Sequence, residues 1–373
     1  MRIIGAKTSY AEFFETLFLK EEGGLLETMK VAVFTGLHKI ELQDLPKPMP
    51  MPGRLLVKVE ASAICTWEQR AYTGVNKIPY PFVGGHEVAG RIEALGEGVS
   101  KEEWHIGDTV VIGAPLACLS CTTCKSGHPE SCAHFDYHAP LDWLPGYRGM
   151  GGLSEYMAVR PESLFHYDGV PAVEAALIEP VTCVVHSIEK ADVALGDTVV
   201  VIGAGIMGQL HMLLAGLRGA RVILSDPNER RLALAKNLGV DFTVNPQKED
   251  LAARVREIMG DGMADIVFDV TASPALVTEA MRCVRPLGKV LFYSSIHPTE
   301  PVPFDPNWVH SKSIQLLGTV NSNDRDFIRA ARLLSNGTLS TKPFVSAVYP
   351  KERIKDAFEA AIAGDKYRVV VTF

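Results

Sequence analysis

The stretch from Asp197 to Asp226, which reads DTVVVIGAGIMGQLHMLLAGLRGARVILSD, constrains the fold of this chain more than any other. Its apolar, β-branched start at Thr198–Ile202 is typical of a buried parallel strand. Three glycines with the spacing G-x-G-x-x-G follow at once. The chain then continues as a predicted helix over Gln209–Leu217 and a predicted strand over Arg221–Leu224. This order of elements predicts a dinucleotide-binding unit.

Each part of this unit has a task in holding a dinucleotide. The glycines allow a tight turn, the close approach of a pyrophosphate and tight packing of the helix on the strand, and the helix N-terminus offers free N–H groups to the phosphates. The acid at the end of the second strand can accept hydrogen bonds from the adenosine ribose. Seven residues are therefore expected to bind the cofactor: Gly203, Gly205, Ile206, Met207, Gly208, Asp226 and Arg231.

Two other interpretations of the stretch are weaker. A glycine-rich turn that arose by chance would not be followed by a helix, a strand and an acid in this order. A membrane span over Thr198–Leu217 would have to bury Gln209 and His211 in lipid. Asp226 also favours NAD over NADP, because its carboxylate would repel the 2′-phosphate of NADP, although Arg231 nearby could pair with that phosphate.

Length, charge and cysteine count limit the kinds of protein to which this chain can belong. The 373 residues are enough for about two domains. A net charge of −7 without a cluster of Lys and Arg argues against nucleic acid as a partner. The first residues lack the layout of a secretory signal, so we expect a cytoplasmic protein with no membrane association. Seven cysteines, an odd number, favour metal ligation or free thiols over disulfides in that compartment.

The residues before the dinucleotide unit are predicted to form a β-rich, barrel-like domain. Met29 opens a strand pair, so residues 1–28 are expected to be dispensable, either as a genuine extension or as an over-read start. Short predicted strands with Gly and Pro turns follow. They cover Arg54–Ala63, Val88–Ala94, Thr109–Ile112 and Gly149–Val159.

From Asp197 onward strands and helices alternate, which predicts a doubly wound parallel sheet. Beyond the first unit, strands are expected at Phe242–Val244, Ala264–Val270, Lys289–Ser295 and Ser313–Val320. Helices are expected at Ala172–Ile178, Val181–Ala191, Glu229–Leu238, Asp250–Met259, Pro274–Val284 and Asp324–Ser335. The extended segments Lys342–Tyr349 and Val369–Phe373 are expected to return to the first domain.

The most specific cysteine pattern is Cys118-x2-Cys121-x2-Cys124-x7-Cys132. Four thiolates at this spacing can close tetrahedrally on one zinc ion, and a site with no open position is structural. Four unrelated free thiols are improbable within so short a segment. An iron–sulfur cluster is a weaker alternative, because the spacing is not one of the usual ferredoxin patterns.

Taken together, the chain resembles the zinc-dependent medium-chain alcohol dehydrogenases, in particular the polyol (sorbitol) and threonine dehydrogenase branch. The resemblance covers residues 29–373. It rests on Cys65, Gly85-His86-Glu87-x2-Gly90, Gly107-Asp108, the four-cysteine segment, Glu179-Pro180 and Gly203-x-Gly205-x2-Gly208.

The resemblance implies an α/β fold with a GroES-like, β-rich catalytic domain and a Rossmann cofactor domain with a doubly wound parallel sheet. It assigns residues 29–180 and 336–373 to the catalytic domain, with a structural zinc lobe at 115–135. It assigns residues 181–335 to the NAD-binding domain and leaves residues 1–28 as an extension of uncertain role. It also implies a homo-oligomer, dimeric or tetrameric.

The resemblance further implies a catalytic zinc held by Cys65, His86 and Glu179, with Glu87 close by and an alternative ligand in some states. One thiolate, one imidazole and one carboxylate leave a fourth position for an alcohol, which then loses its proton easily and passes hydride to the nicotinamide. Taken singly, a buried thiol, a core histidine or an acid at a helix end would need no metal. The expected activity is hydride transfer between a secondary alcohol or polyol and NAD (EC 1.1.1.-), with one catalytic and one structural zinc.

One departure from the family pattern concerns the proton path. The family has a hydroxyl residue two positions after the catalytic cysteine, where this chain has Trp67. Thr66 on a strand-like segment would point to the opposite side. We therefore expect water at the metal to work with Glu87, Glu68 to orient His86, and Trp67 to form one wall of the substrate pocket.

Two alternative functions remain open at this level. In the first, the chain is a zinc-stapled dinucleotide-binding protein with a structural or sensing role, in which Trp67 blocks the substrate position and no alcohol is turned over. In the second, it is a zinc-free quinone or enoyl reductase, against which Cys65, His86 and the four-cysteine segment argue. The remaining cysteines and several histidines are expected to be packing residues: Cys183, Cys283, His186, His211 and His310.

Overall fold

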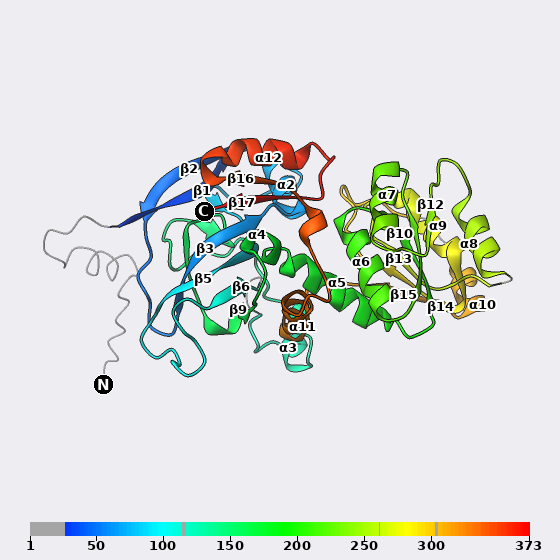
Figure 1. Ribbon diagram of the computed structural model, residues 1–373, viewed down its shortest axis with the longest axis horizontal. Coiled ribbons are helices and arrows are strands. Elements are labelled where there is room, and N and C mark those ends of the chain that lie inside the picture. The colour runs from blue at the N-terminus through cyan, green and yellow to red at the C-terminus, as the bar shows by residue number, and fades with distance from the viewer. Residues whose placement is uncertain (1–26, 114–116, 261, 303–304) are drawn as a thin grey trace, which may run out of the picture.

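Three sheets make up the strand framework of the computed structural model, which describes residues 27–113, 117–260, 262–302 and 305–373. Figure 1 shows the sheets distributed over two lobes that lie side by side. Helix α5 (Ile178–Ala191) runs between the lobes, and α11 (Asp324–Ser335) packs against it. Of residues 1–28, which are expected to be dispensable, 1–26 lie outside the described residues, and Thr28 is the first residue of a strand.

The first lobe contains a four-stranded sheet in the order β2-β1-β4-β7 and a seven-stranded sheet in the order β16-β17-β3-β5-β6-β9, with β8 paired to β3. The hairpin of β1 and β2 confirms the strand pair expected from Met29 onward, and β17 pairs with β3, so the end of the chain returns to this lobe. The strands are β1 (Thr28–Gly36), β2 (Lys39–Pro46), β3 (Leu55–Ala63), β4 (Phe82–Val83), β5 (Glu87–Leu95), β6 (Thr109–Ile112), β7 (Arg148–Gly149), β8 (Tyr156–Val159), β9 (Leu164–His166), β16 (Val345–Pro350) and β17 (Arg368–Thr372).

The second lobe is built on a six-stranded, all-parallel sheet in the order β12-β11-β10-β13-β14-β15. This is the doubly wound dinucleotide-binding order, with the switch point between β10 and β13. The strands are β10 (Thr198–Ile202), β11 (Arg221–Ser225), β12 (Phe242–Val244), β13 (Ala264–Asp269), β14 (Val284–Phe292) and β15 (Gln315–Gly318). The helices are α6 (Ile206–Leu217), α7 (Glu229–Asn237), α8 (Leu251–Met259), α9 (Pro274–Cys283) and α10 (Pro306–Lys312).

A single hydrophobic cluster joins the two lobes. It includes Ala63 and Val111 of the seven-stranded sheet as well as Val199 and Val201 of the parallel sheet, all buried, with side chains of α5 in the same cluster. Because both sheets use α5 to cover apolar surface, the first turn of α5 is held in place from both sides.

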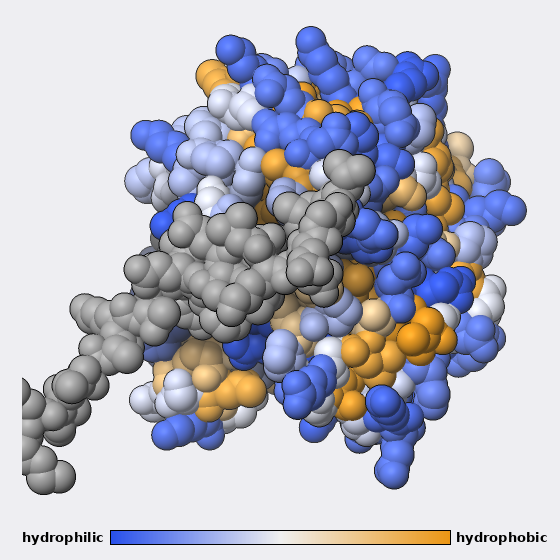
Figure 2. Space-filling model, turned by 90° about the vertical axis from the view of Figure 1, so that its left-hand side faces the viewer, coloured by the Kyte–Doolittle hydropathy of each residue, from blue (hydrophilic) through white to orange (hydrophobic). Residues whose placement is uncertain are grey.

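The remaining helices of the first lobe are short, apart from α12. They are α2 (Thr66–Tyr72), α3 (Thr122–Lys125), α4 (Ala172–Ala175) and α12 (Ile354–Ile362), with four 3₁₀ turns at Pro129–Ser131, Pro161–Ser163, Lys342–Phe344 and Lys351–Arg353. The end of this lobe that Figure 2 presents is mostly hydrophilic, with apolar residues in small groups. Among the described helices, none combines the length and apolar character needed to cross a bilayer.

Three expectations about local structure are wrong. The segment after Cys65 is the helix α2 and not strand-like. The helix expected at Ala172–Ile178 ends at Ala175, and Ile178 already belongs to α5. Pro180 is tolerated there because it occupies the first turn, where its missing N–H has no partner to lose.

The strand expected at Gly149–Val159 is interrupted and forms β7 and β8 instead. Gly149 and Gly151 have positive φ angles of 120° and 85°, which a continuous strand does not allow.

Candidate active site and metal centres

Cys65, His86 and Glu87 form a cluster at one edge of the seven-stranded sheet. Cys65 is the N-cap of α2, just beyond β3, and His86 lies immediately before β5, which begins at Glu87. One ligand atom from each of the three residues lies within 4.8 Å of the others. Neighbouring strands thus bring Cys65 together with residues 21 and 22 positions later in the sequence.

The position of His86 depends on two glycines in close contact. Gly85 has φ +92°, and a Cβ atom there would lie 2.6 Å from the carbonyl carbon of Gly152. The backbone N–H of Gly152 donates to the carbonyl of Gly85 at 3.1 Å. A side chain at either position would push the two segments apart and move His86.

Glu68 holds the His86 ring. The Glu68 side chain is only 1% exposed, and its Oε1 accepts from the backbone N–H of Gly85 at 3.1 Å and lies 2.8 Å from His86 Nδ1. A carboxylate at Nδ1 favours the tautomer that leaves Nε2 free for a metal ion. Burial opposes a charge on His86, but Glu68 and the Cys65 sulfur outweigh it and raise the pKa of His86 well above its usual value.

Glu87 is committed to a buried ion pair. Its Oε1 and Oε2 accept from Arg368 Nη2 at 2.7 Å and Nε at 2.9 Å, and Arg368 Nη2 also lies 3.7 Å from Cys65 Sγ. Burial raises the pKa of the Cys65 thiol, although Arg368 and His86 act in the opposite direction. Both oxygens of Glu87 are therefore engaged by the Arg368 guanidinium.

Glu179 lies in the first turn of α5 and does not belong to the group of mutually close ligand atoms found among the described residues. Burial raises its pKa to about 7. Its Oε1 accepts from Cys183 Sγ at 3.6 Å.

Cys183, expected to be a packing residue, thus contacts the candidate ligand Glu179. The signal for it was its position four residues after Glu179, which on a helix places both side chains on one face. His310, also expected to be a packing residue, is exposed on α10.

The four cysteines of the second pattern also converge. One sulfur from each of Cys118, Cys121, Cys124 and Cys132 lies within 4.8 Å of the others. The Sγ atoms of Cys121 and Cys124 are 3.5 Å apart, and those of Cys118 and Cys124 are 4.0 Å apart. A tetrahedron with Zn–S bonds of about 2.3 Å has edges of about 3.8 Å, so the sulfur set fits zinc.

Backbone N–H groups donate to the sulfur atoms of Cys118 and Cys132, whereas burial raises the pKa of Cys124 to about 12. The N–H of Cys121 donates to Cys118 Sγ, and the N–H groups of Cys118 and His134 donate to Cys132 Sγ, all at 3.3 Å. Hydrogen bonds from Ser120 lower the pKa of Cys118 to about 5. A deprotonated sulfur is the form that binds a metal.

The glycine-rich turn leaves room for a dinucleotide. A Cβ at Gly208 would lie 1.7 Å from the carbonyl oxygen of Gly203, so the helix packs against the turn too closely for a side chain. In front of Gly205, by contrast, a Cβ would meet nothing within 4 Å. Gly205 is also the N-cap of α6, which begins with Ile206 and Met207. The open space therefore lies where a phosphate would approach the helix N-terminus.

Asp226 closes the far side of this turn and is 5% exposed. Its Oδ2 accepts from the N–H of Ala204 at 2.7 Å, and its Oδ1 accepts from the N–H of Asn228 at 2.8 Å. Arg231 Nη1 lies 3.7 Å from Asp226 Oδ2. The carboxylate is thus fixed beside the turn, with one guanidinium nearby.

Trp67 belongs to an aromatic group beside the Cys65 cluster. Its ring centroid lies 5.5 Å from that of Tyr137, 5.8 Å from Phe82 and 6.1 Å from His138. The Tyr137 hydroxyl donates to Asn321 Oδ1 at 2.8 Å, which ties the segment after the cysteine lobe to the end of the parallel sheet. Because Trp67 and Thr66 lie on a helix, they differ by about 100° in direction and do not point to opposite sides.

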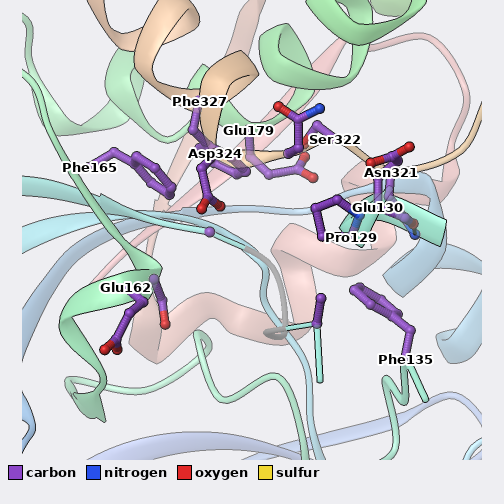
Figure 3. Close-up of a pocket in the computed structure, with 14 residues that line it drawn as sticks. Pro129, Glu130, Phe135, Glu162, Phe165, Glu179, Asn321, Ser322, Asp324 and Phe327 are labelled. Carbon is purple, nitrogen blue, oxygen red and sulfur yellow. Dashed lines mark hydrogen bonds between the residues drawn. The ribbon is translucent and has the colours of Figure 1, made fainter. Parts of the chain in front are cut away.

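A pocket next to Glu179 is drawn in Figure 3. Its walls come from the cysteine lobe, from the segment around β9 and from the start of α11. Asp324 and Glu179 lie near one another on one side, and Phe135 lies opposite. The pocket thus lies beside Glu179, and none of its described lining residues belongs to the group of Cys65, His86 and Glu87.

Two family models match the chain in consecutive segments. Residues 51–171 match the alcohol dehydrogenase GroES-like domain, and residues 207–336 match the zinc-binding dehydrogenase model. The 2-dehydro-3-deoxy-L-galactonate 5-dehydrogenase of Pseudoalteromonas atlantica is 31% identical over 83% of this chain and 88% of its own length. The sorbitol dehydrogenase of Bacillus subtilis is 28% identical over 90% of this chain and 94% of its own length.

Solved structures agree in fold. A zinc-binding dehydrogenase from Sinorhizobium meliloti bound to NADP superimposes with a TM-score of 0.85, at 25% identity over 93% of this chain and 100% of that chain. A dehydrogenase from Escherichia coli complexed with NADH gives a TM-score of 0.82, at 25% identity over 93% of this chain and 99% of that chain. With its GroES-like and parallel-sheet lobes and its two sets of metal-ligand side chains, the chain belongs to the zinc-dependent medium-chain alcohol dehydrogenase family.

Proposed function

We propose that this protein oxidises a secondary alcohol or polyol, with NAD as the hydride acceptor and two zinc ions per chain. The observation that carries the proposal is the convergence of Cys65, His86 and Glu87 on one point, beside an open dinucleotide turn. We also propose that the chain has two functional units. The catalytic unit comprises residues 29–180 and 336–373, and the NAD-binding unit comprises residues 181–335.

For the catalytic zinc we propose Cys65, His86 and Glu179 as ligands. Glu87 is close enough to compete, but Arg368 already engages both of its oxygens. When bound, this zinc would act as a Lewis acid that polarises the alcohol oxygen. Cys118, Cys121, Cys124 and Cys132 would hold the second, structural zinc.

For the cofactor we propose NAD, which would accept the hydride at its nicotinamide C4. The fixed carboxylate of Asp226 would accept from the ribose hydroxyls and repel a 2′-phosphate. Arg231 works against this preference because it could pair with the phosphate. The two structural relatives above, one bound to NADP and one to NADH, show that related chains hold either cofactor.

The residues around the cluster would orient and shield the alcohol. Glu68 fixes His86, and the rings of Trp67 and Tyr137 would form an apolar wall that positions the carbinol C–H bond. The C–H electron pair passes to NAD as hydride and the carbonyl forms, while the hydroxyl proton is released. Trp67 cannot accept that proton and Glu87 is held by Arg368, so we propose that it leaves to water in the pocket.

A spectrophotometric screen tests the proposal. Protein loaded with zinc should reduce NAD in the presence of a secondary alcohol or polyol, and metal analysis should find two zinc ions per chain. Cys65→Ser should abolish reduction while the protein stays folded. No NADH or NADPH formation with a broad panel of polyols, inositols and secondary alcohols would contradict the proposed activity.

A further inference from the structure

An open cavity of about 450 Å³ lies among the C-terminal parts of three helices, α5, α6 and α11. Helix α5 packs against both of the others. None of the cavity's described lining residues belongs to the Cys65 cluster or to the glycine-rich turn. It is therefore a separate feature of the protein, with a volume that suits a small organic molecule.

The floor of this cavity is apolar. Val185 and Ile188 of α5 and Leu214 of α6 line it, and all three are buried. Leu217, the last residue of α6, lines the same cavity and is 51% exposed. An apolar group seated here would cover Leu217, and burial of that surface would favour binding.

The rim of the cavity is positively charged. Three arginines and one carboxylate line it: Arg218, Arg329, Arg332 and Glu189. The carboxylate is shared, because Glu189 Oε1 pairs with Arg218 and its Oε2 lies 3.2 Å from Arg329 Nη1. The guanidinium of Arg332 is exposed and forms no ion pair or hydrogen bond with the residues that the structure describes. Two of the three positive charges thus have no negative counterpart in the lining.

The ends of α6 and α11 oppose this charge but do not cancel it. Both helices end at the cavity, and the C-terminal end of a helix carries roughly half a negative charge. Two such ends offset about one of the two remaining positive charges. Asn336, just after α11, accepts from the N–H of Thr338 through its Oδ1, so its NH₂ group is left to donate to an anion.

We propose that this cavity binds an aliphatic carboxylate, with the carboxylate at Arg332 and the alkyl chain on the apolar floor. A guanidinium can donate two parallel hydrogen bonds to a carboxylate, and Arg332 has no competing acceptor among the described residues. The rim would repel a cation, and a short anion such as acetate would leave the floor uncovered. The carboxylate would be a second ligand of the protein and not the alcohol that is oxidised.

Matched probes separate the charge from the alkyl chain. Octanoate, octanamide and octylammonium share a chain length and differ in charge, while acetate has the charge without the chain. In calorimetric titrations of the zinc-loaded protein, octanoate should bind about tenfold more tightly than octanamide, because its hydrogen bonds to the guanidinium are charge-assisted. Octylammonium and acetate should not bind measurably. Octanoate should also raise the thermal midpoint, since a ligand of the folded state stabilises it.

Substitutions test the assigned residues. Arg332→Gln should weaken the binding of octanoate by about tenfold and leave that of octanamide unchanged. Arg256→Gln, which removes an equal charge from an exposed position on α8, is the matched control and should change neither. Leu217→Ala should weaken both alkyl ligands alike.

A carboxylate could also bind a zinc ion, so the same titration is made with Cys65→Ala protein. Octanoate should bind this variant as it binds the native chain, and loss of binding would place the carboxylate at the catalytic zinc and overturn the inference. Equal affinity for octanoate and octanamide, or unchanged affinity in Arg332→Gln, would overturn it as well. A native dimer that Leu217→Ala dissociates, together with no binding of octanoate, would assign the cavity to a second copy of the chain. Each of these results leaves the proposed function intact.

Discussion

Arg368 and Glu87, 281 residues apart, form a bidentate ion pair with side chains that are 4% and 0% exposed. The pairing of strands brings them together: Val370 of β17 lies opposite Ala63 of β3, which lies opposite Glu87 of β5. The C-terminal strand β17 thus places the guanidinium of Arg368 next to Glu87 and Cys65. The local charge at the candidate metal site therefore depends on the last strand of the chain.

Removal of Arg368 should be costly because it leaves a buried carboxylate unpaired. We expect Arg368→Ala to lower the free energy of unfolding by about 3–5 kcal/mol. Thermal unfolding of the zinc-loaded protein, with urea titration as a second measure, checks this. The double variant Arg368→Met with Glu87→Leu should recover part of the loss, since no charge is then left unpaired. A single variant as stable as the native chain would contradict the ion pair.

Loss of the structural zinc and loss of the catalytic zinc should affect the protein differently. Cys121→Ser should lose one zinc and lower stability, because binding of a structural zinc is coupled to folding. Cys65→Ala should lose the other zinc and all turnover, with a thermal midpoint close to that of the native chain. Metal analysis by mass spectrometry, unfolding and activity on the same samples check both. A single zinc per native chain would remove one of the two sites.

The sequence predicts the parallel sheet well because its strands are buried on both faces and appear as continuous β-branched runs. Val199 to Ile202 is such a run, and β10 and β12 have the predicted bounds. Metal ligands with short spacing, such as Cys121 and Cys124, are likewise visible as a pattern. Both predictions depend only on patterns within short stretches of the sequence.

Contacts that depend on tertiary structure could not be predicted in this way. The pairing of Arg368 with Glu87 follows from two strand registers that no local pattern contains. Helix α2 was missed because its first residues follow directly on an alternating strand and its N-cap, Cys65, makes no side-chain capping hydrogen bond. That error also misplaced Thr66 relative to Trp67.

Cofactor choice should respond to Asp226. Asp226→Asn keeps an oxygen that can accept from the N–H of Ala204 or Asn228 but removes the negative charge. We expect kcat/KM with NADP to rise by about tenfold relative to NAD, which corresponds to about 1.4 kcal/mol of repulsion removed. Arg231→Gln serves as the control and should weaken NADP further. Comparable efficiency of the native protein with both cofactors would contradict the role given to Asp226.

His211 should make stability depend on pH. It is buried between α5 and α6, with Nε2 2.8 Å from Ser187 Oγ and Nδ1 2.7 Å from the Met207 carbonyl oxygen, and burial lowers its pKa to about 4. The unfolded chain takes up this proton near pH 6.5 but the folded chain does so only near pH 4. The stability that the folded state gains from the neutral His211 ring is therefore complete above pH 6.5 and is lost as pH falls toward 4.

Acidification from pH 7.5 to pH 5 should lower the free energy of unfolding by about 2 kcal/mol through His211 alone. His211→Gln cannot titrate, so its stability, although lower at pH 7.5, should fall less on acidification. Urea unfolding at the two pH values measures the difference. Parallel pH slopes for the native chain and the variant would show that His211 titrates normally.

Trp67 should determine substrate preference and not metal binding. Its ring packs on Tyr137 and Phe82, and it makes no contribution to the ligand set. Trp67→Ser should therefore keep two zinc ions, while the space it opens raises kcat/KM for bulkier secondary alcohols by about tenfold relative to small ones. Trp67→Phe, which keeps the wall, should resemble the native chain. Loss of zinc from Trp67→Ser would mean that the ring supports the metal site itself.

The same helix allows a test of the proton path. Glu87→Gln leaves Arg368 without its buried partner, whereas Thr66→Val changes only an exposed hydroxyl at the first turn of α2. We expect Glu87→Gln to depress turnover by at least tenfold and Thr66→Val by less than twofold, because release of the proton to water needs no side-chain hydroxyl. The pH profile of kcat should keep its shape in Thr66→Val. If Thr66→Val proves the more damaging change and shifts that profile, the relay hydroxyl has moved by one residue along α2, and the direct release to water is wrong.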